Sequence, residues 1–117
     1  MDIALAIEYL GLNNNEYLLN QNNSPNQLVE WLGPDTRPTD AELETAWSAF
    51  KPIEALRQLR DKRNLLLADT DWWANSDLTM TSEQTAYRTA LRDLPSTSTP
   101  SLNDGLELTG VAWPTKP

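Results

Sequence analysis

Residues 60–73 read RDKRNLLLADTDWW, and the sequence on both sides of this stretch has the period of an α-helix. Apolar residues recur at spacings of three and four before its centre and again after it. The first stripe consists of Leu56, Leu59, Arg63, Leu66 and Leu67, and the second of Tyr87, Ala90, Leu91 and Leu94. Residues 71–77, between the two stripes, are rich in types that end helices or form turns. We therefore expect a helical hairpin with Trp72 and Trp73 at its bend.

The two neighbouring tryptophans are expected to have different roles. Adjacent side chains on a helical or turn backbone point in different directions, so Trp72 and Trp73 are not expected to share one environment. We expect one of them to be buried between the two arms, against Leu67, Tyr87 and Leu91. The other is then available to pack beneath the N-terminal helix or to anchor a partner.

The second arm of the hairpin has clear end signals. Thr81 and Gln84 have the spacing of a capping box, with Thr81 at the N-cap. We expect this helix to end at Leu94, because Pro95 lacks a backbone N–H and disfavours helix in the residue before it.

The N-terminal part contains a short helix and two short apolar runs. Residues 3–10 fit a helix, with Asp2 as its N-cap and Gly11 just beyond its end. Such a short helix must dock either on the hairpin core or on another chain. Residues 16–19 and 28–32 fit two strands around a polar connection at 20–27.

Two further boundaries are set by prolines. Thr39 and Glu42 have capping-box spacing, whereas Pro52 lies inside the apolar stripe that follows. We expect either one bent helix over about 40–68 or two helices meeting at residues 51–52. From Pro95 onward the chain has no helical period, which predicts an extended tail. Trp113 is its obvious anchor, on the hairpin surface or on a partner.

These signals predict a fold that is mostly α with a minor β part: a helical hairpin, a short N-terminal helix, a small β-hairpin and an extended C-terminal tail. They divide the chain into the N-terminal helix and β-hairpin at 1–38, the helical hairpin at 39–95 and the tail at 96–117.

Charge is unevenly distributed along the 117 residues. The chain carries 17 acidic and 9 basic residues, a formal net charge of −8. Residues 1–50 hold eight acidic side chains and one basic side chain, Arg37. An acidic surface argues against nucleic acid and anionic membranes as partners. No apolar run has membrane-spanning length and no basic region resembles the start of a signal peptide, so we expect a cytoplasmic protein.

Few residue types suited to catalysis are present. The chain has no histidine and no cysteine, which removes Ser–His pairs, thiol nucleophiles and thiolate zinc sites. Asp69 and Asp71 could be taken as paired carboxylates, but acids at a helix end more often cap it or pair with arginines. We expect Arg88 or Arg92 on the facing arm to pair with Asp69 or Asp71. Arg57 and Asp61, four residues apart, are expected to form another pair. We expect that the protein is not an enzyme and that it binds no cofactor and no metal.

Protein–protein binding is the function that the remaining residues favour. Five tryptophans are many for this length, and aromatic residues and arginine are enriched at protein interfaces. A nucleic-acid surface would need a net basic face, which the acidic residues among the arginines dilute. Our candidate partner-binding residues are Trp31, Arg60, Arg63, Trp72, Trp73 and Trp113. A homo-oligomer is an open alternative.

Two motifs resemble a known family. Residues 60–72 fit Arg-x-x-Arg-x-x-Leu-Leu-x-x-Thr-Asp-Trp, and residues 84–94 fit Gln-x-x-Tyr-Arg-x-x-Leu-Arg-x-Leu. With a final Trp113-Pro114, this pattern resembles the phage tail assembly chaperone family over about residues 56–114. The N-terminal part is similar to the front of small tail and tail-fibre assembly proteins, apart from an insertion around residues 13–26.

The resemblance implies a non-enzymatic helper of phage tail or tail-fibre assembly. Its partner would be a tail or tail-fibre protein, met in the host cytoplasm during assembly. The alternative is a structural adaptor that is retained in the tail or fibre of the mature virion.

Overall fold

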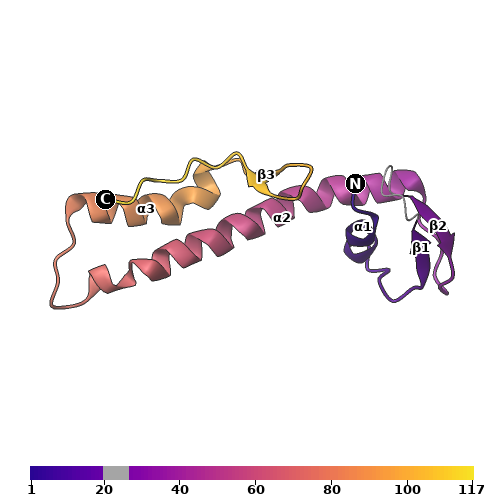
Figure 1. Ribbon diagram of the computed structural model, residues 1–117, viewed down its shortest axis with the longest axis horizontal. Coiled ribbons are helices and arrows are strands. Elements are labelled where there is room, and N and C mark those ends of the chain that lie inside the picture. The colour runs from indigo at the N-terminus through magenta and orange to yellow at the C-terminus, as the bar shows by residue number, and fades with distance from the viewer. Residues whose placement is uncertain (20–26) are drawn as a thin grey trace. The chain divides into compact units, whose positions relative to one another are not determined.

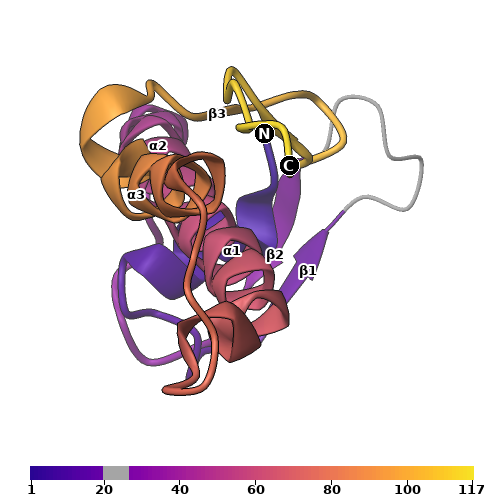
Figure 2. The same cartoon turned by 90° about the vertical axis from the view of Figure 1, so that its left-hand side faces the viewer.

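The structure is a computed structural model that describes residues 1–19 and 27–117. Helices make up most of the regular structure in these residues, and strands occur in two short hairpins. This confirms the predicted fold class. Figures 1 and 2 show the elements in two views at right angles. In chain order they are α1 (Ile3–Tyr9), β1 (Tyr17–Leu19), β2 (Leu28–Trp31), α2 (Asp40–Asp69), the 3₁₀ helix η1 (Asp71–Ala74), α3 (Ser82–Thr97), β3 (Ser101–Leu102) and β4 (Leu108–Thr109).

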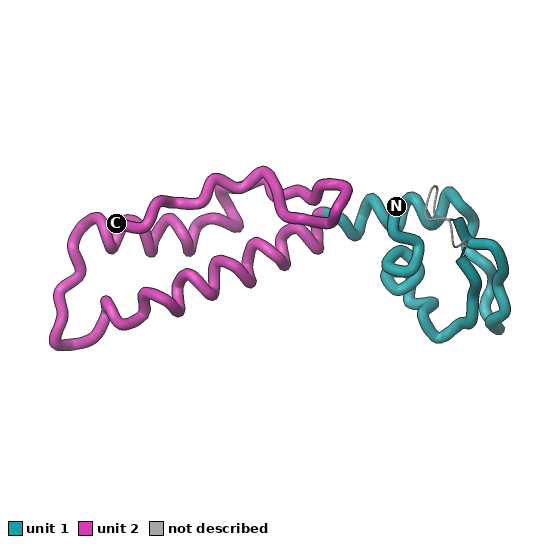
Figure 3. The backbone as a smooth tube through the Cα atoms, in the orientation of Figure 1, with its two compact units in different colours: residues 1–51 teal, residues 52–117 magenta. Residues whose placement is uncertain are grey.

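The chain divides into two compact units, residues 1–51 and residues 52–117 (Figure 3). We call them unit 1 and unit 2. Unit 1 contains α1, β1, β2 and the first part of α2, and unit 2 contains the remaining elements. The C-terminal tail therefore belongs to the same unit as the helical hairpin.

Helix α1 has the caps that the sequence predicts. The Leu5 N–H donates to Asp2 Oδ1 over 3.0 Å, so Asp2 is the N-cap. Gly11 has a φ of 74°, in the left-handed region that glycine adopts without a Cβ penalty. The Leu12 N–H reaches back to the Ile7 carbonyl (3.1 Å), as in a Schellman motif. Both ends of this short helix are thus fixed locally.

Helix α1 docks within its own chain, but on the unit 1 core and not on the core of the helical hairpin. Strands β1 and β2 pair antiparallel, with Tyr17 opposite Trp31, and these two rings stack with centroids 5.9 Å apart. A lone two-stranded hairpin is marginal in water, and here it packs on a helical core. The unit 1 core consists of Ile3, Ala6, Ile7, Leu28, Leu43 and Ala46, with Leu12, Tyr17, Leu19, Trp31 and Trp47 against it. The two predicted strands are confirmed, and the predicted connection lies outside the described residues except for Gln27.

A buried asparagine holds the loops of unit 1 together. Asn15 Nδ2 donates to Asp35 Oδ2 (2.8 Å) and to the Leu12 carbonyl (3.0 Å). Asn15 Oδ1 accepts from the Asp35 N–H (3.1 Å), and Trp31 Nε1–H donates to the Asp35 carbonyl (2.7 Å). A Cβ at Gly33 would overlap the Asn15 side chain. Glycine is required there because this backbone approaches a buried polar group so closely.

Helix α2 is continuous through its internal proline. It begins at the predicted cap, where the Glu42 N–H donates to Thr39 Oγ1 (3.1 Å). Pro52 has no N–H to offer the Ser48 carbonyl, so one backbone hydrogen bond is missing, yet the helix runs on to Asp69. Of the two alternatives from the sequence, the single helix is the one observed. Buried side chains on both sides of Pro52 offset the lost bond.

The predicted helical hairpin forms unit 2, with α3 alongside the later part of α2 (Figure 1). The apolar stripe of α3 faces this contact, because its buried members recur at helical spacing. The core consists of Leu59, Trp73, Tyr87, Leu91 and Leu94. Leu66, Leu67, Met80, Leu108, Val111 and Trp113 pack against it.

The end of α3 differs from our prediction. The capping box at Thr81 is present in full, but the helix continues past Leu94 and contains Pro95 in its last turn. Pro95 has no N–H to offer the Leu91 carbonyl, so one backbone hydrogen bond is missing in this turn. The hydroxyls of Ser96 and Thr97 donate to the Asp93 carbonyl at 2.8 and 3.1 Å. Burial of Leu94 outweighs its poor local preference.

The extended tail contains a short β-hairpin that we did not predict. Strands β3 and β4 pair antiparallel through a tight turn in which Leu106 has a φ of 60°. Gln58 Nε2 donates to the Leu106 carbonyl (3.1 Å), which ties this turn to α2. Leu102 is buried, and the chain after β4 packs against the unit 2 core (Figures 1 and 2). The sequence lacked a signal because a strand of two residues has no measurable period.

We predict that the tail contributes to stability. Leu102 has 7% of its surface exposed, so Leu102→Ala should lower the free energy of unfolding by about 2–5 kcal/mol. Leu65, at 73% exposed, is the control, since Leu65→Ala should change stability by no more than about 0.5 kcal/mol. Urea denaturation followed by circular dichroism gives both values. Equal stability of the two variants would show that the tail is not part of the folded core.

Candidate functional site

The connection between α2 and α3 is a succession of hydrogen-bonded turns. The Thr70 N–H donates to the Leu67 carbonyl (3.1 Å), and the Trp73 N–H to the Thr70 carbonyl (3.0 Å). The Asn75 N–H then donates to the Trp72 carbonyl (3.2 Å). Because these backbone groups bond to each other, the bend holds its two tryptophans on a defined backbone rather than on an open loop.

A buried arginine joins the two arms at this bend. Arg88 on α3 donates from Nη1 to the Thr70 hydroxyl (2.7 Å) and to the Leu67 carbonyl (2.9 Å), and from Nη2 to Asp71 Oδ1 (2.9 Å). The last carbonyls of a helix have no partner within it, and a cation there also complements the helix dipole. Arg88 therefore caps α2 from the neighbouring helix. Its Nε has no hydrogen-bond partner among the described residues.

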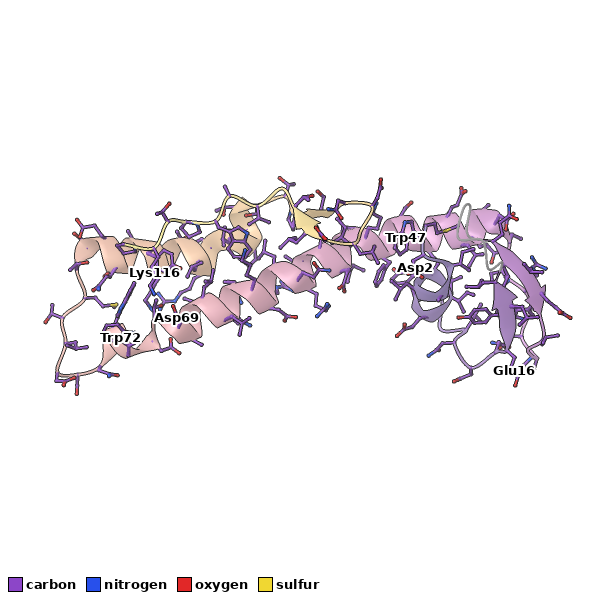
Figure 4. All side chains as sticks on the ribbon, in the orientation of Figure 1. Asp2, Glu16, Trp47, Asp69, Trp72 and Lys116 are labelled. Atoms are coloured by element: carbon purple, nitrogen blue, oxygen red, sulfur yellow. The ribbon has the colours of Figure 1, made fainter. Side chains whose placement is uncertain are left out.

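The two aspartates of the bend are engaged in ion pairs. Asp71 pairs with Arg88, which confirms that predicted contact, whereas Asp69 pairs with Lys116 of the tail (3.0 Å). Figure 4 labels Asp69 and Lys116 beside Trp72 at this end of unit 2. The two carboxylates have separate basic partners and do not form one acid–base pair. Within residues 1–19 and 27–117, no three His, Cys, Asp or Glu side chains lie together as a metal site would require.

The outer face of α2 carries a small charge network. Arg57 bonds Glu54 (2.6 Å) and Asp61 (2.7 Å), so the predicted pair of Arg57 with Asp61 is confirmed. The hydrogen bonds from Arg57 lower the pKa of Glu54 below its ordinary value, against the opposing effect of burial. Exposed pairs of this kind contribute little stability and offer no reactive group.

The two tryptophans point into different environments, as predicted. Trp73 is 5% exposed and lies in the core, with its ring centroid 6.0 Å from that of Tyr87. Trp72 is 57% exposed and meets Trp73 edge to face, with centroids 6.2 Å apart. The buried indole therefore supports the exposed one from beneath. Most of the apolar surface of Trp72 stays in contact with water, so its burial contributes little to the stability of the fold.

Two further large apolar side chains on either side of Trp72 in the sequence are exposed. Leu65 lies on α2, about two helical turns before Trp72, and Leu78 lies in the connection that follows η1. Both are large and exposed. We call Leu65, Trp72 and Leu78 the bend surface. We treat these three exposed side chains of unit 2 as candidates for a protein-binding surface.

The remaining predicted residues lie in different places. Arg60 is exposed, with no ion pair to any described residue, and Arg63 is half-buried and bonds Asn64. Trp113 packs on the unit 2 core with Lys62 Nζ 4.4 Å from its ring centroid. Trp31 belongs to unit 1 and packs on that core. Five of the six candidates thus lie in unit 2, and the partner-binding role of all six stays a prediction.

Sequence reasoning missed two exposed leucines of the bend surface. A signal for Leu65 was present: residues 65–67 are three consecutive leucines, and three adjacent helix positions span about 200°. One of them must therefore point away from a single buried face. Leu78 follows no period, because it lies in an irregular segment.

Comparison with known proteins places the hairpin in a family. A family model described as phage tail assembly chaperone protein matches residues 56–117, slightly more than half of the chain. No curated protein and no solved structure matches the chain. The matched region coincides with nearly all of unit 2, including the Arg88 contacts and the bend surface.

The unequal burial of the paired tryptophans gives a matched mutational test. Trp73→Ala should lower the free energy of unfolding by about 3–5 kcal/mol, because it leaves a cavity between the arms. Trp72→Ala should cost less than about 1 kcal/mol, since most of its surface is already in water. Thermal and urea denaturation of the two variants measures this difference. Similar losses in both would contradict the assignment of Trp72 to an exposed surface.

Proposed function

Because the chain belongs to the phage tail assembly chaperone family, we propose that it is a non-enzymatic helper that binds a phage tail or tail-fibre protein during assembly. Its task would be to shield apolar surface of that protein until the protein trimerises or docks. Such binding would take place in the host cytoplasm. Among the described residues, no helix is long and apolar enough to cross a membrane.

The exposed Trp72 is the observation that carries this proposal. Trp72 rests on the buried Trp73 and is set on a backbone whose turns are hydrogen-bonded. An indole held in place loses little conformational freedom on binding, so more of its burial becomes affinity. Tryptophan is also among the residues most often found at the energetic centre of interfaces. Leu65 and Leu78 are further exposed apolar side chains of the same unit.

A non-enzymatic role is supported by the chemistry of the bend. Asp69 and Asp71 are each paired with a basic side chain, and the sequence offers no histidine or cysteine to act beside them. Arg60 at the exposed edge of α2 would add a charged contact to a partner. Contacts of this kind direct association more than they add affinity.

A structural adaptor retained in the virion is the second candidate. It is favoured by the packing of the tail, since Leu102 is buried and Lys116 is paired with Asp69. A unit whose tail is already packed needs little further ordering on binding, which favours the stable complex that a permanent component forms.

Co-expression with a tail or tail-fibre protein of the same phage tests the chaperone. The soluble, correctly assembled fraction of that protein should rise several-fold with the wild-type chain. It should fall back with Trp72→Ala, while circular dichroism shows that this variant is folded. Leu102→Ala is the control for stability loss alone. Equal solubility of the tail protein with and without this chain would contradict the proposal.

Purified virions distinguish the two candidates. If the protein is a chaperone that is released, quantitative mass spectrometry of virions should find it far below one copy per tail, while infected cells contain it in quantity. A fixed stoichiometry with the other tail proteins would instead identify the retained adaptor.

A further inference from the structure

Unit 1 contains an apolar groove that its fold does not explain. The groove has a volume of about 460 Å³ and lies between the end of α1 and the first turns of α2. Small-molecule and side-chain pockets of proteins commonly have this size. Its walls are mostly apolar and are formed by Tyr9, Leu10, Ala41, Glu42, Thr45, Ala46 and Ala49.

The walls of this groove are held in place. Tyr9 meets Phe50 edge to face with ring centroids 6.4 Å apart, and Phe50 stacks in turn on Trp47. The backbone beyond Tyr9 is fixed by the left-handed Gly11 and its Schellman bond. Tyr9 and Leu10 are nevertheless exposed. The buried face of α1 is Ile3, Ala6 and Ile7, so the core is complete without these two side chains.

The charge around the groove is negative. Glu42 is the charged residue in its wall, and no basic side chain among the described residues pairs with it. Residues 1–51 hold eight acidic side chains against two basic ones, Arg37 and Lys51. Arg37 donates to the Leu28 carbonyl (2.7 Å), so its guanidinium is already engaged. A partner that brings lysine or arginine next to an apolar side chain would complement this surface.

The groove also lies outside the region that defines the family. The family match begins at residue 56, whereas every wall residue lies between 9 and 49. The groove therefore lies in the N-terminal unit, which the family match does not cover, and it would add a second contact to the bend surface of unit 2.

We propose that the groove binds an apolar segment with adjacent lysine or arginine residues in the tail protein that this chain assists. This inference rests on the proposed function and deepens it, because it names the chemistry of the recognised segment. An apolar side chain would enter between α1 and α2, and its basic neighbour would pair with Glu42. A contact of this small area gives weak, reversible binding, as release after assembly requires.

The test uses the full-length protein and overlapping peptides that span the tail proteins of the same phage. Wild-type protein should bind peptides that combine apolar residues with net positive charge, and added salt should weaken this binding. Glu42→Lys should weaken peptide binding about tenfold, because it places a cation next to the lysine or arginine of the peptide. Thr45→Trp, which fills the groove, should abolish it. Amide NMR spectra of each variant establish that unit 1 is folded.

Glu44→Lys is the matched control. It makes the same change in net charge on the same helix, but residue 44 lies about 200° around α2 from residue 42 and is not part of the groove. Binding by Glu44→Lys should stay within about twofold of wild type. Equal losses in Glu42→Lys and Glu44→Lys would reduce the effect to overall charge and overturn the inference.

Intact tail proteins separate failure of this inference from failure of the proposed function. If wild-type protein and the groove variants capture an intact tail protein equally well, the groove is not its binding site. The proposed function is unaffected by that result. Bound peptides that are acidic or uncharged would also contradict the groove. Wild-type protein that binds none of the intact tail proteins would contradict both.

Discussion

The hydrogen bonds of Arg88 are the contact on which the rest of unit 2 depends. One guanidinium reaches the last turn of α2, the hydroxyl of Thr70 and the carboxylate of Asp71. These bonds fix where α2 ends, where the bend begins and how α3 approaches, so Trp73 is buried between the arms and Trp72 is not. Arg88 itself is buried, and a buried cation left without partners is strongly destabilising. The geometry of the bend is therefore set by electrostatics as much as by apolar packing.

Features set by neighbours in sequence could be predicted. The stripes of α2 and α3, the caps at Asp2 and Thr81 and the unequal roles of the two tryptophans all follow from helical period and side-chain direction. Features set by distant contacts could not. Pro95 stays within the helix because Leu94 beside it is buried in the unit 2 core. The tail forms a hairpin because it has a surface to pack on. The groove forms only where α1 and α2 lie side by side, and no local sequence pattern predicts that contact.

The two units differ in family match and in charge, which suggests two different roles in binding a partner. Unit 2 carries the family match, the exposed Trp72 and nearly balanced charge. Unit 1 lies wholly outside the match and carries most of the negative charge. We propose that the bend surface supplies apolar affinity of a general kind, while the groove of unit 1 selects the partner by charge. Electrostatic complementarity suits that second role because it discriminates among partners more than it strengthens binding.

The positions of Pro38 and Pro52 have a practical consequence for detecting the protein. Arg37 and Lys51 are the basic residues of unit 1, and each is followed directly by a proline, at the loop before α2 and inside α2. Trypsin cleaves poorly where a proline follows the basic residue, because the ring obstructs the scissile bond. A digest would then contain residues 1–57 as one long acidic fragment, which is poorly suited to ionisation. A protease that cleaves after glutamate divides the same stretch into short pieces, at Glu8, Glu16, Glu30 and Glu42 among others.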